Sequence, residues 1–154
     1  MRIVPVLTVL LGSVAMVAAQ PAAKPPAAGA AVAKQTYDVP MNGKPQTFYM
    51  LSRVFKPGED IGLHTHDGVE ISWVIRGNIR LVIAGGESKI YHAGESFLIP
   101  RGTVHDPVNV GPGEAEVAVN YVLDKGSPMR NPLNIPLPPE CKKTGPCSVK
   151  APAK

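Results

Sequence analysis

Three histidines and one glutamate are the side chains of this sequence whose types and spacing could do chemistry. His64 and His66 are two residues apart, and residues two apart in a β-strand point to the same face. Glu70 follows across an Asp67-Gly68 turn, where a hairpin would bring its carboxylate back beside both imidazoles. Imidazoles with one carboxylate suit a first-row divalent metal ion.

A second stretch, residues 94–109, supplies His105. Three imidazoles and one carboxylate would leave an octahedral ion two open positions, and open positions distinguish a reactive metal site from a closed structural one. The alternative is that the three histidines are hydrogen-bonded core residues. The fourth histidine, His92, is outside both stretches, and we expect it to be a surface or strand-edge imidazole.

The spacing of these residues resembles the two sequence motifs of the cupin family. The first motif is a glycine, five residues, His-x-His, three residues, a glutamate, six residues and a glycine. The second is a glycine, five residues, Pro-x-Gly, two residues, a histidine, three residues and an asparagine. Every position of both motifs is present, at Gly58, His64, His66, Glu70 and Gly77 and at Gly94, Pro100, Gly102, His105 and Asn109.

The resemblance implies an all-β fold, the cupin double-stranded β-helix (jelly-roll) barrel, over residues 37–124, with a metal ion in its mouth. It implies His64, His66, Glu70 and His105 as the metal ligands. Glu70 could instead be a general base beside the metal, so it is also the candidate catalytic residue. The glycines and Pro100 are expected to shape turns, and Asn109 to cap a strand end.

The rest of this region agrees with an all-β core. Short runs rich in β-branched and aromatic residues alternate with Gly and Pro turns, and no long run has a helical period. If Glu70 points inward, Ser72 and Val74 do so too, while Ile71, Trp73 and Ile75 point outward. Such an apolar outer face should be covered by another strand or by a second subunit, so we expect a homodimer.

The two ends of the chain differ from this core. Residues 1–19 have one early arginine, an uncharged apolar run and small residues before Gln20, which is typical of a secretory signal peptide. The alternative, an uncleaved membrane anchor, would need a longer apolar run, so no stable span is expected after cleavage. Residues 20–36 are expected to be a Pro/Ala-rich linker, and residues 125–154 a basic, Pro-rich tail. Both extensions are expected to be disordered.

The charge distribution limits the possible partners, and the cysteines indicate the cellular compartment. Residues 35–124 contain seven Lys/Arg and eleven Asp/Glu, so the net charge of +4 comes from the ends of the chain. An acidic core without a basic groove argues against nucleic-acid binding. Cys141 and Cys147 are close enough for one local disulfide in a periplasmic or secreted protein. A soft metal site is the alternative, but no His or Met is near them.

Metal binding follows from these residues, but a particular reaction does not. One hypothesis is a metal-dependent enzyme, dioxygenase-like or related, that acts on a small oxygen-rich molecule. The other is a non-catalytic module of the cell envelope that binds a metal or a small ligand. Fe, Mn, Ni, Cu and Zn all suit three histidines and a glutamate.

Overall fold

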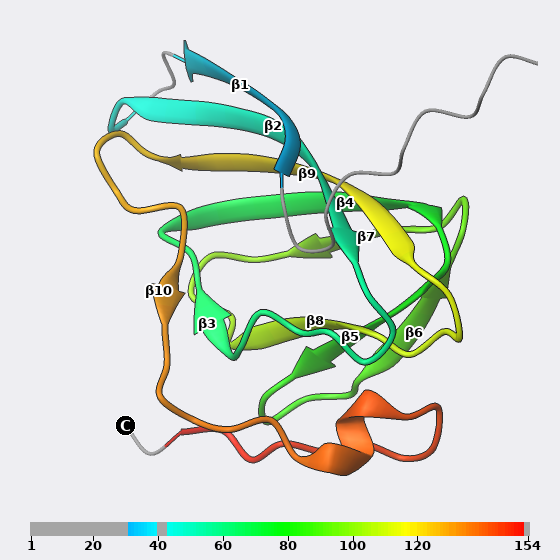
Figure 1. Cartoon of the computed structure of the whole chain (residues 1–154). Helices are drawn as coiled ribbons and strands as arrows, with labels where there is room; N and C mark the ends of the chain where they lie inside the picture. Colours follow the sequence, from blue (N-terminus) through cyan, green and yellow to red (C-terminus); the bar gives the residue numbers. More distant parts are fainter. Residues whose placement is uncertain (1–30, 40–42, 153–154) are drawn as a thin grey trace, which may run out of the picture.

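The structure, a computed structural model, describes residues 31–39 and 43–152. These residues form two five-stranded antiparallel sheets that face each other (Figure 1). The first sheet contains, in spatial order, β1 (Ala31–Val39), β2 (Gln46–Phe55), β9 (Ala115–Asp124), β4 (Gly68–Arg76) and β7 (Ser96–Ile99). The second contains β10 (Asn131–Pro132), β3 (His64–Thr65), β8 (His105–Asn109), β5 (Asn78–Ile83) and β6 (Lys89–His92). The prediction of an all-β jelly roll is confirmed.

Helix is almost absent from the described part of the chain. One 3-10 turn, η1 (Pro139–Lys142), is found there, and none of the described residues forms a helix long and apolar enough to cross a bilayer. The expected signal segment, residues 1–19, lies outside the described residues. Residues 31–36, expected to be linker, belong to β1, which pairs with β2.

The connection between the histidine strand and the glutamate strand differs from the expected hairpin. β3 pairs with β8 and β10 in the second sheet, whereas β4 lies between β9 and β7 in the first. The Asp67-Gly68 turn therefore passes from one sheet to the other, and the turn at Gly77 passes back. In a jelly roll, successive strands alternate between the two sheets, so Glu70 faces the histidines from the opposite wall.

Gly68 shows why this crossing needs a glycine. A Cβ placed on Gly68 would lie 2.0 Å from the Val122 carbonyl oxygen and 2.7 Å from the Leu123 Cα. Because β9 passes so close, any side chain here would push β4 away from it. Gly68 therefore allows the pairing of β4 with β9 that positions Glu70 two residues later.

The main core lies between the two sheets, and β4 illustrates how its strands face it. Glu70, Ser72 and Val74 are at most 4% exposed, whereas Ile71, Trp73 and Ile75 are 44–53% exposed. The predicted alternation along this strand is confirmed. Within the described part of the chain no strand covers the outward residues, because β7 pairs with β4 edge to edge.

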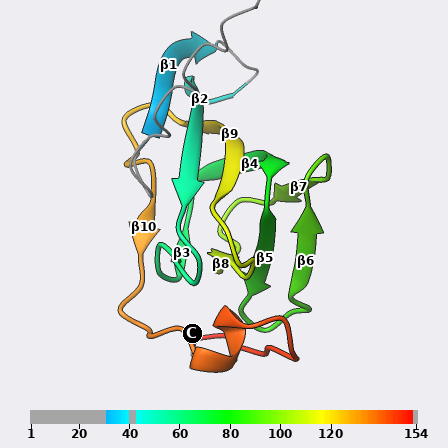
Figure 2. The ribbon, with the colours of Figure 1, turned by 45° about the vertical axis from the view of Figure 1, so that its right-hand side comes forward.

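The C-terminal segment is a correction to the expected disordered tail. Residues 133–149 run along the outer face of the second sheet, beneath β5 and β8 (Figures 1 and 2). Leu133, Ile135 and Leu137 pack there in a second apolar cluster with Val82 and Val108, which are fully buried. The many prolines of this segment suggested that it had no apolar face to bury. Its alternating apolar residues provide such a face.

Arg80 and the disulfide fix the end of this segment. Cys141 and Cys147 are joined by a disulfide, and Cys141 is fully buried. The guanidinium of Arg80 on β5 is 4% exposed and donates to the carbonyl oxygens of Glu140, Cys141 and Gly145 at 2.5–3.5 Å. A buried cation is tolerated here because these carbonyl dipoles replace water.

Replacement of Arg80 by methionine should lower the free energy of unfolding by about 3 kcal/mol, because buried carbonyls would lose their donor. Urea unfolding followed by tryptophan fluorescence measures this change. The matched control is Arg101→Met, which removes an exposed ion pair with Asp124 and should cost less than about 1 kcal/mol. Equal losses in the two variants would contradict the role given to Arg80.

Candidate metal centre

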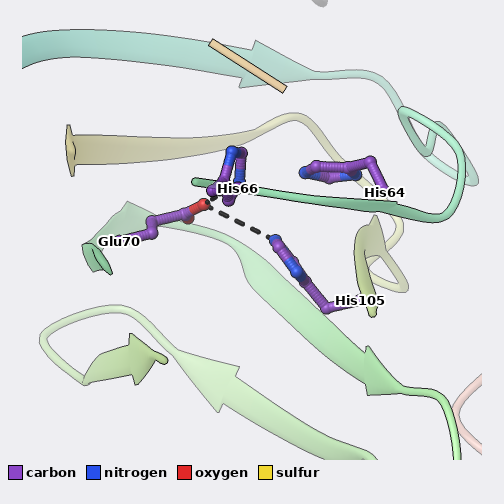
Figure 3. Close-up of side chains that lie close together, drawn as sticks. All are labelled: His64, His66, Glu70 and His105. Carbon is purple, nitrogen blue, oxygen red and sulfur yellow. Dashed lines mark ion pairs between the residues drawn. The ribbon is translucent and has the colours of Figure 1, made fainter. Parts of the chain in front are cut away.

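The four candidate ligands come from both sheets and meet inside the barrel. His64 opens β3 and pairs in register with His105, the first residue of β8. His66 follows β3, and Glu70 projects from β4 on the opposite wall (Figure 3). All four side chains are buried, with relative exposures of 0–4%. The structure therefore brings together the four residues that the sequence singled out.

A backbone carbonyl fixes the tautomer of each ring. The Nδ1 atoms of His64, His66 and His105 lie 2.7, 2.6 and 2.9 Å from the carbonyl oxygens of Gly62, Met129 and Thr103. A carbonyl oxygen only accepts hydrogen bonds, so each Nδ1 carries the proton and donates it. In the neutral rings, each Nε2 is then left with a free lone pair.

These lone pairs have no hydrogen-bond donor facing them. The Nε2 atoms of all three histidines are buried without a hydrogen-bond partner, and the four ligand atoms lie within 4.8 Å of one another. The Glu70 Oε2 atom is 3.0 Å from the Nε2 of His66 and 3.6 Å from that of His105. Lone pairs that face a carboxylate so closely repel it unless a cation lies between them, so this donor set fits a divalent metal ion.

The protonation states of the site agree with metal binding. Burial, helped by the neighbouring His105, lowers the pKa of His64 to about 3, so its ring is neutral at pH 7. Burial raises the pKa of Glu70, but hydrogen bonds to its ionised form outweigh burial and lower the pKa to about 2; they come from the His105 and His66 rings when Nε2 is protonated, and from the Ser72 hydroxyl. Neutral imidazoles and an ionised carboxylate are the forms that coordinate metals.

Two residues next to the ligands support them. The Ser72 hydroxyl donates to Glu70 Oε1 at 2.6 Å, which leaves Oε2 directed at the histidines. The ring of Tyr121 lies against that of His66, with centroids 4.8 Å apart. Neither residue belongs to the two motifs, but their inward position follows from strand parity with Glu70 and with Val119.

Asn109, the last residue of the second motif, has the structural role that was expected of it. Asn109 is fully buried, and its side-chain amide donates to the carbonyl oxygens of Phe55 and Gly113 while its oxygen accepts from the Gly111 amide. It thus fastens the end of β8 to the end of β2. His92 is exposed and contacts Asn78, away from the site, as predicted.

A pocket opens beside the ligands. Its wall includes Glu70, Ser72 and Tyr121, together with Arg53 from β2 and apolar side chains from both sheets. Its enclosed space is small, about that of one water molecule, and the space around it is open to solvent. Arg53 was not among the sequence candidates, because an arginine inside a β-rich run carries no motif.

Acidification should destabilise the metal-free protein through His64. Its pKa is about 3 in the folded protein and about 6.5 in the unfolded chain. The unfolded chain therefore binds more protons between these values, and His64 lowers stability by up to about 1.4 kcal/mol for each pH unit below 6.5. Asp106 acts in the opposite sense, because burial raises its pKa to about 7 and its contribution is lost as the pH rises toward that value.

Urea unfolding of chelator-treated protein at several pH values between 4 and 7 measures this effect. His64→Gln should lose less stability on acidification than the parent protein, and His92→Gln, at an exposed position, should behave like the parent. An identical pH slope in His64→Gln and the parent would show that His64 is not the titrating group.

Comparison with known proteins gives a family and relatives for this arrangement. The family model described as the cupin domain matches residues 52–122. Among curated proteins, oxalate oxidase 2 of Hordeum vulgare is 37% identical over 75 residues, which are 44% of this chain and 34% of that protein. Germin-like protein 3-5 of Oryza sativa subsp. japonica is also 37% identical, over 44% of this chain and 33% of its own length. The chain thus spans about a third of the length of these relatives.

Solved structures include other cupins. An oxalate oxidase in complex with the substrate analogue glycolate is 32% identical, with a TM-score of 0.43, over 49% of this chain and 41% of that one. A cupin-like protein from Thermotoga maritima is 26% identical, with a TM-score of 0.48, over 57% of this chain and 64% of that one.

The family-model match covers β3 to β8, the last four residues of β2 and most of β9, and therefore includes all four candidate ligands. Both motifs lie within it, and the two sheets have the jelly-roll arrangement. Residues 52–122 form a cupin domain.

Proposed function

We propose that this cupin is an exported, metal-dependent enzyme that acts on a small oxygen-rich molecule, with His64, His66, Glu70 and His105 as the metal ligands. The observation that carries the proposal is the set of three buried Nε2 lone pairs that converge, with one carboxylate oxygen, on a single point. A satisfied histidine core would pair these atoms with donors instead.

The chain's own residues would bind and orient the substrate. A divalent ion with two open positions supplies Lewis-acid or redox chemistry to oxygen atoms that chelate it. Glu70 is held by Ser72 and is ionised, which suits a metal ligand. It could also accept a proton from a chelating hydroxyl whose acidity the metal raises. Apolar walls would exclude water from the pocket. The oxalate oxidases among the relatives support an oxidation of a small oxygen-rich molecule.

The alternative is a non-catalytic module that holds a metal or a small ligand. One observation favours it: apart from Glu70, the polar residues that line the pocket are only Arg53, Ser72 and Tyr121. Burial and the nearby Glu70 carboxylate raise the pKa of Tyr121, so this phenol stays protonated and is a poor base. Glu70 would be the one proton acceptor at the site.

Two features support export to the periplasm or the medium. Residues 1–19 have the charge and apolar pattern of a secretory signal. The Cys141–Cys147 disulfide suits an oxidising compartment. A chain that folds outside the cytoplasm meets its metal there, where intrinsic affinity favours Cu and Zn over Mn and Fe. Elemental analysis of protein purified from its native compartment identifies the ion.

Metal binding should depend on the four candidate ligands. The parent protein should bind one divalent ion per chain, and His105→Gln should weaken binding by at least about 100-fold, because an amide is a poorer donor than imidazole. Equilibrium dialysis with Zn²⁺ measures both affinities. His92→Gln is the control, and full binding by His105→Gln would overturn the assigned site.

Oxygen uptake distinguishes an enzyme from a binding module. Protein loaded with Fe, Mn, Ni, Cu or Zn is supplied with catechols, flavonols and small oxo-acids in an oxygen electrode. We expect uptake with at least one redox-active metal, and loss of that uptake in Glu70→Gln. A protein that binds its metal but consumes no oxygen and forms no product would favour the module.

We also propose that the outer face of the first sheet forms a homodimer contact. Ile71 and Leu98 are paired across β4 and β7, and Trp73 lies beside them, each about half exposed. Contiguous apolar surface of this kind is typical of subunit contacts.

Sedimentation tests this contact. The parent protein should sediment as a dimer and Trp73→Glu as a monomer, because a carboxylate would be buried without a partner. Lys89→Glu, on the second sheet, should remain dimeric. A monomeric parent protein would contradict the proposal.

A further inference from the structure

Arg53 is the one described arginine whose charge the protein leaves without a partner. Arg76 pairs with Glu114 and Glu116, and Arg101 pairs with Asp124. Arg80 donates to three carbonyl oxygens, and Arg130 donates to that of Ile61. Arg53 has no ion pair or hydrogen bond from its guanidinium within the described part of the chain, and its Nε is buried without an acceptor.

The surroundings of Arg53 compensate its charge only in part. Its guanidinium lies over the ring of Phe55, 5.2 Å from the centroid, and this cation–π contact stabilises the cation. Burial lowers the pKa of Arg53, and the nearby positive charge of Arg130 lowers it further. Tyr121, Glu59 and Asp106 act in the opposite direction, but none of them forms an ion pair or a hydrogen bond with the guanidinium. A partly buried cation of this kind gains most when an anion pairs with it.

The backbone of Arg53 is displaced along the first sheet from that of Glu70. On β9, Tyr121 pairs with Glu70, whereas Val117, four residues earlier, pairs with Arg53. Four residues of strand span roughly 13 Å, of which the long arginine side chain can cover part. The rest of the pocket wall is apolar, formed by Phe55, Ile61, Phe97, Pro107, Val117 and Val119.

We infer that Arg53 binds an anionic group of the ligand and selects for a molecule with three parts. One end chelates the metal through two oxygens, the middle is short and apolar, and the other end carries a carboxylate that the Arg53 guanidinium receives. This inference rests on the proposed function, because the chelating end needs the metal. It excludes ligands, such as oxalate, that are too short to reach both ends.

Matched ligand pairs test this assignment. Malate and 2-hydroxybutyrate share a chelating hydroxy-acid end and differ in a remote carboxylate. The same is true of 2-hydroxyglutarate and 2-hydroxyvalerate, and 3,4-dihydroxybenzoate and catechol form an aromatic pair. Zn²⁺-loaded protein avoids redox turnover, and isothermal titration calorimetry gives the affinity of each compound.

In the parent protein, the remote carboxylate should tighten binding by about 10- to 100-fold in at least one pair, the effect of a charge-assisted hydrogen bond. Arg53→Gln should abolish this preference while it keeps one Zn²⁺ per chain and the affinity for the uncharged partner. Arg53→Lys should keep part of the preference. Arg101→Gln, an exposed arginine outside the pocket, should behave like the parent.

The failures are distinguishable. If the parent protein does not bind Zn²⁺, or binds it but none of the chelating compounds, the proposed function fails. If it binds Zn²⁺ and the chelating compounds but shows no preference for the remote carboxylate in any pair, the role of Arg53 is wrong. A preference that persists in Arg53→Gln would also overturn that role. The comparison within the parent protein needs no variant, so it stands even if Arg53→Gln does not fold.

Discussion

Three hydrogen bonds from imidazole Nδ1 atoms to backbone carbonyls are the constraint on which the rest of this site depends. They orient the rings and fix the tautomer, so that every Nε2 lone pair faces the same small volume. The accepting carbonyls belong to turns and to the segment before β10, so loop conformation controls the donor set. The Glu70 carboxylate completes the site from the opposite sheet, and Ser72 holds it there. The charge of a metal ion would resolve the repulsion that this arrangement creates.

The jelly roll satisfies this constraint by bringing distant strands together. β3 and β8 are adjacent in the second sheet although about forty residues separate them in the chain, and this pairing places His64 opposite His105. The crossing at Gly68 then moves the chain to the first sheet, where β4 presents Glu70 inward. Two features secure the frame: Asn109 joins β8 to β2, and the C-terminal segment covers the outer face of the second sheet. The contacts that stabilise the barrel therefore also hold the strands that carry the metal ligands.

The sequence predicted the ligand set and the fold class because both depend on local spacing. Ten motif positions fix the order of turns and strands, and strand parity alone places Ser72 inside and Trp73 outside. Features that depend on contacts between distant segments of the chain were predicted less well. The sequence of a turn such as Asp67-Gly68 does not show whether the turn closes a hairpin or crosses between sheets. The pairing of β4 with β9, a distant strand, determines that it crosses. The C-terminal segment was expected to be disordered because it is rich in proline. The sequence does not reveal the apolar outer face of the second sheet, against which this segment packs.

Arg53 shows the same limit at the site itself. An arginine in a β-rich run is usually a solvated residue at a strand edge, and no motif marks it. Its significance comes from what surrounds it: the ring of Phe55 beneath it, Arg130 nearby, and no carboxylate in contact. Arg53 is only partly buried, but its Nε has no acceptor and no carboxylate neutralises its charge, so the fold gains little from it. Its position on the wall of the pocket that reaches Glu70 is therefore better explained by what the pocket binds than by what the fold requires.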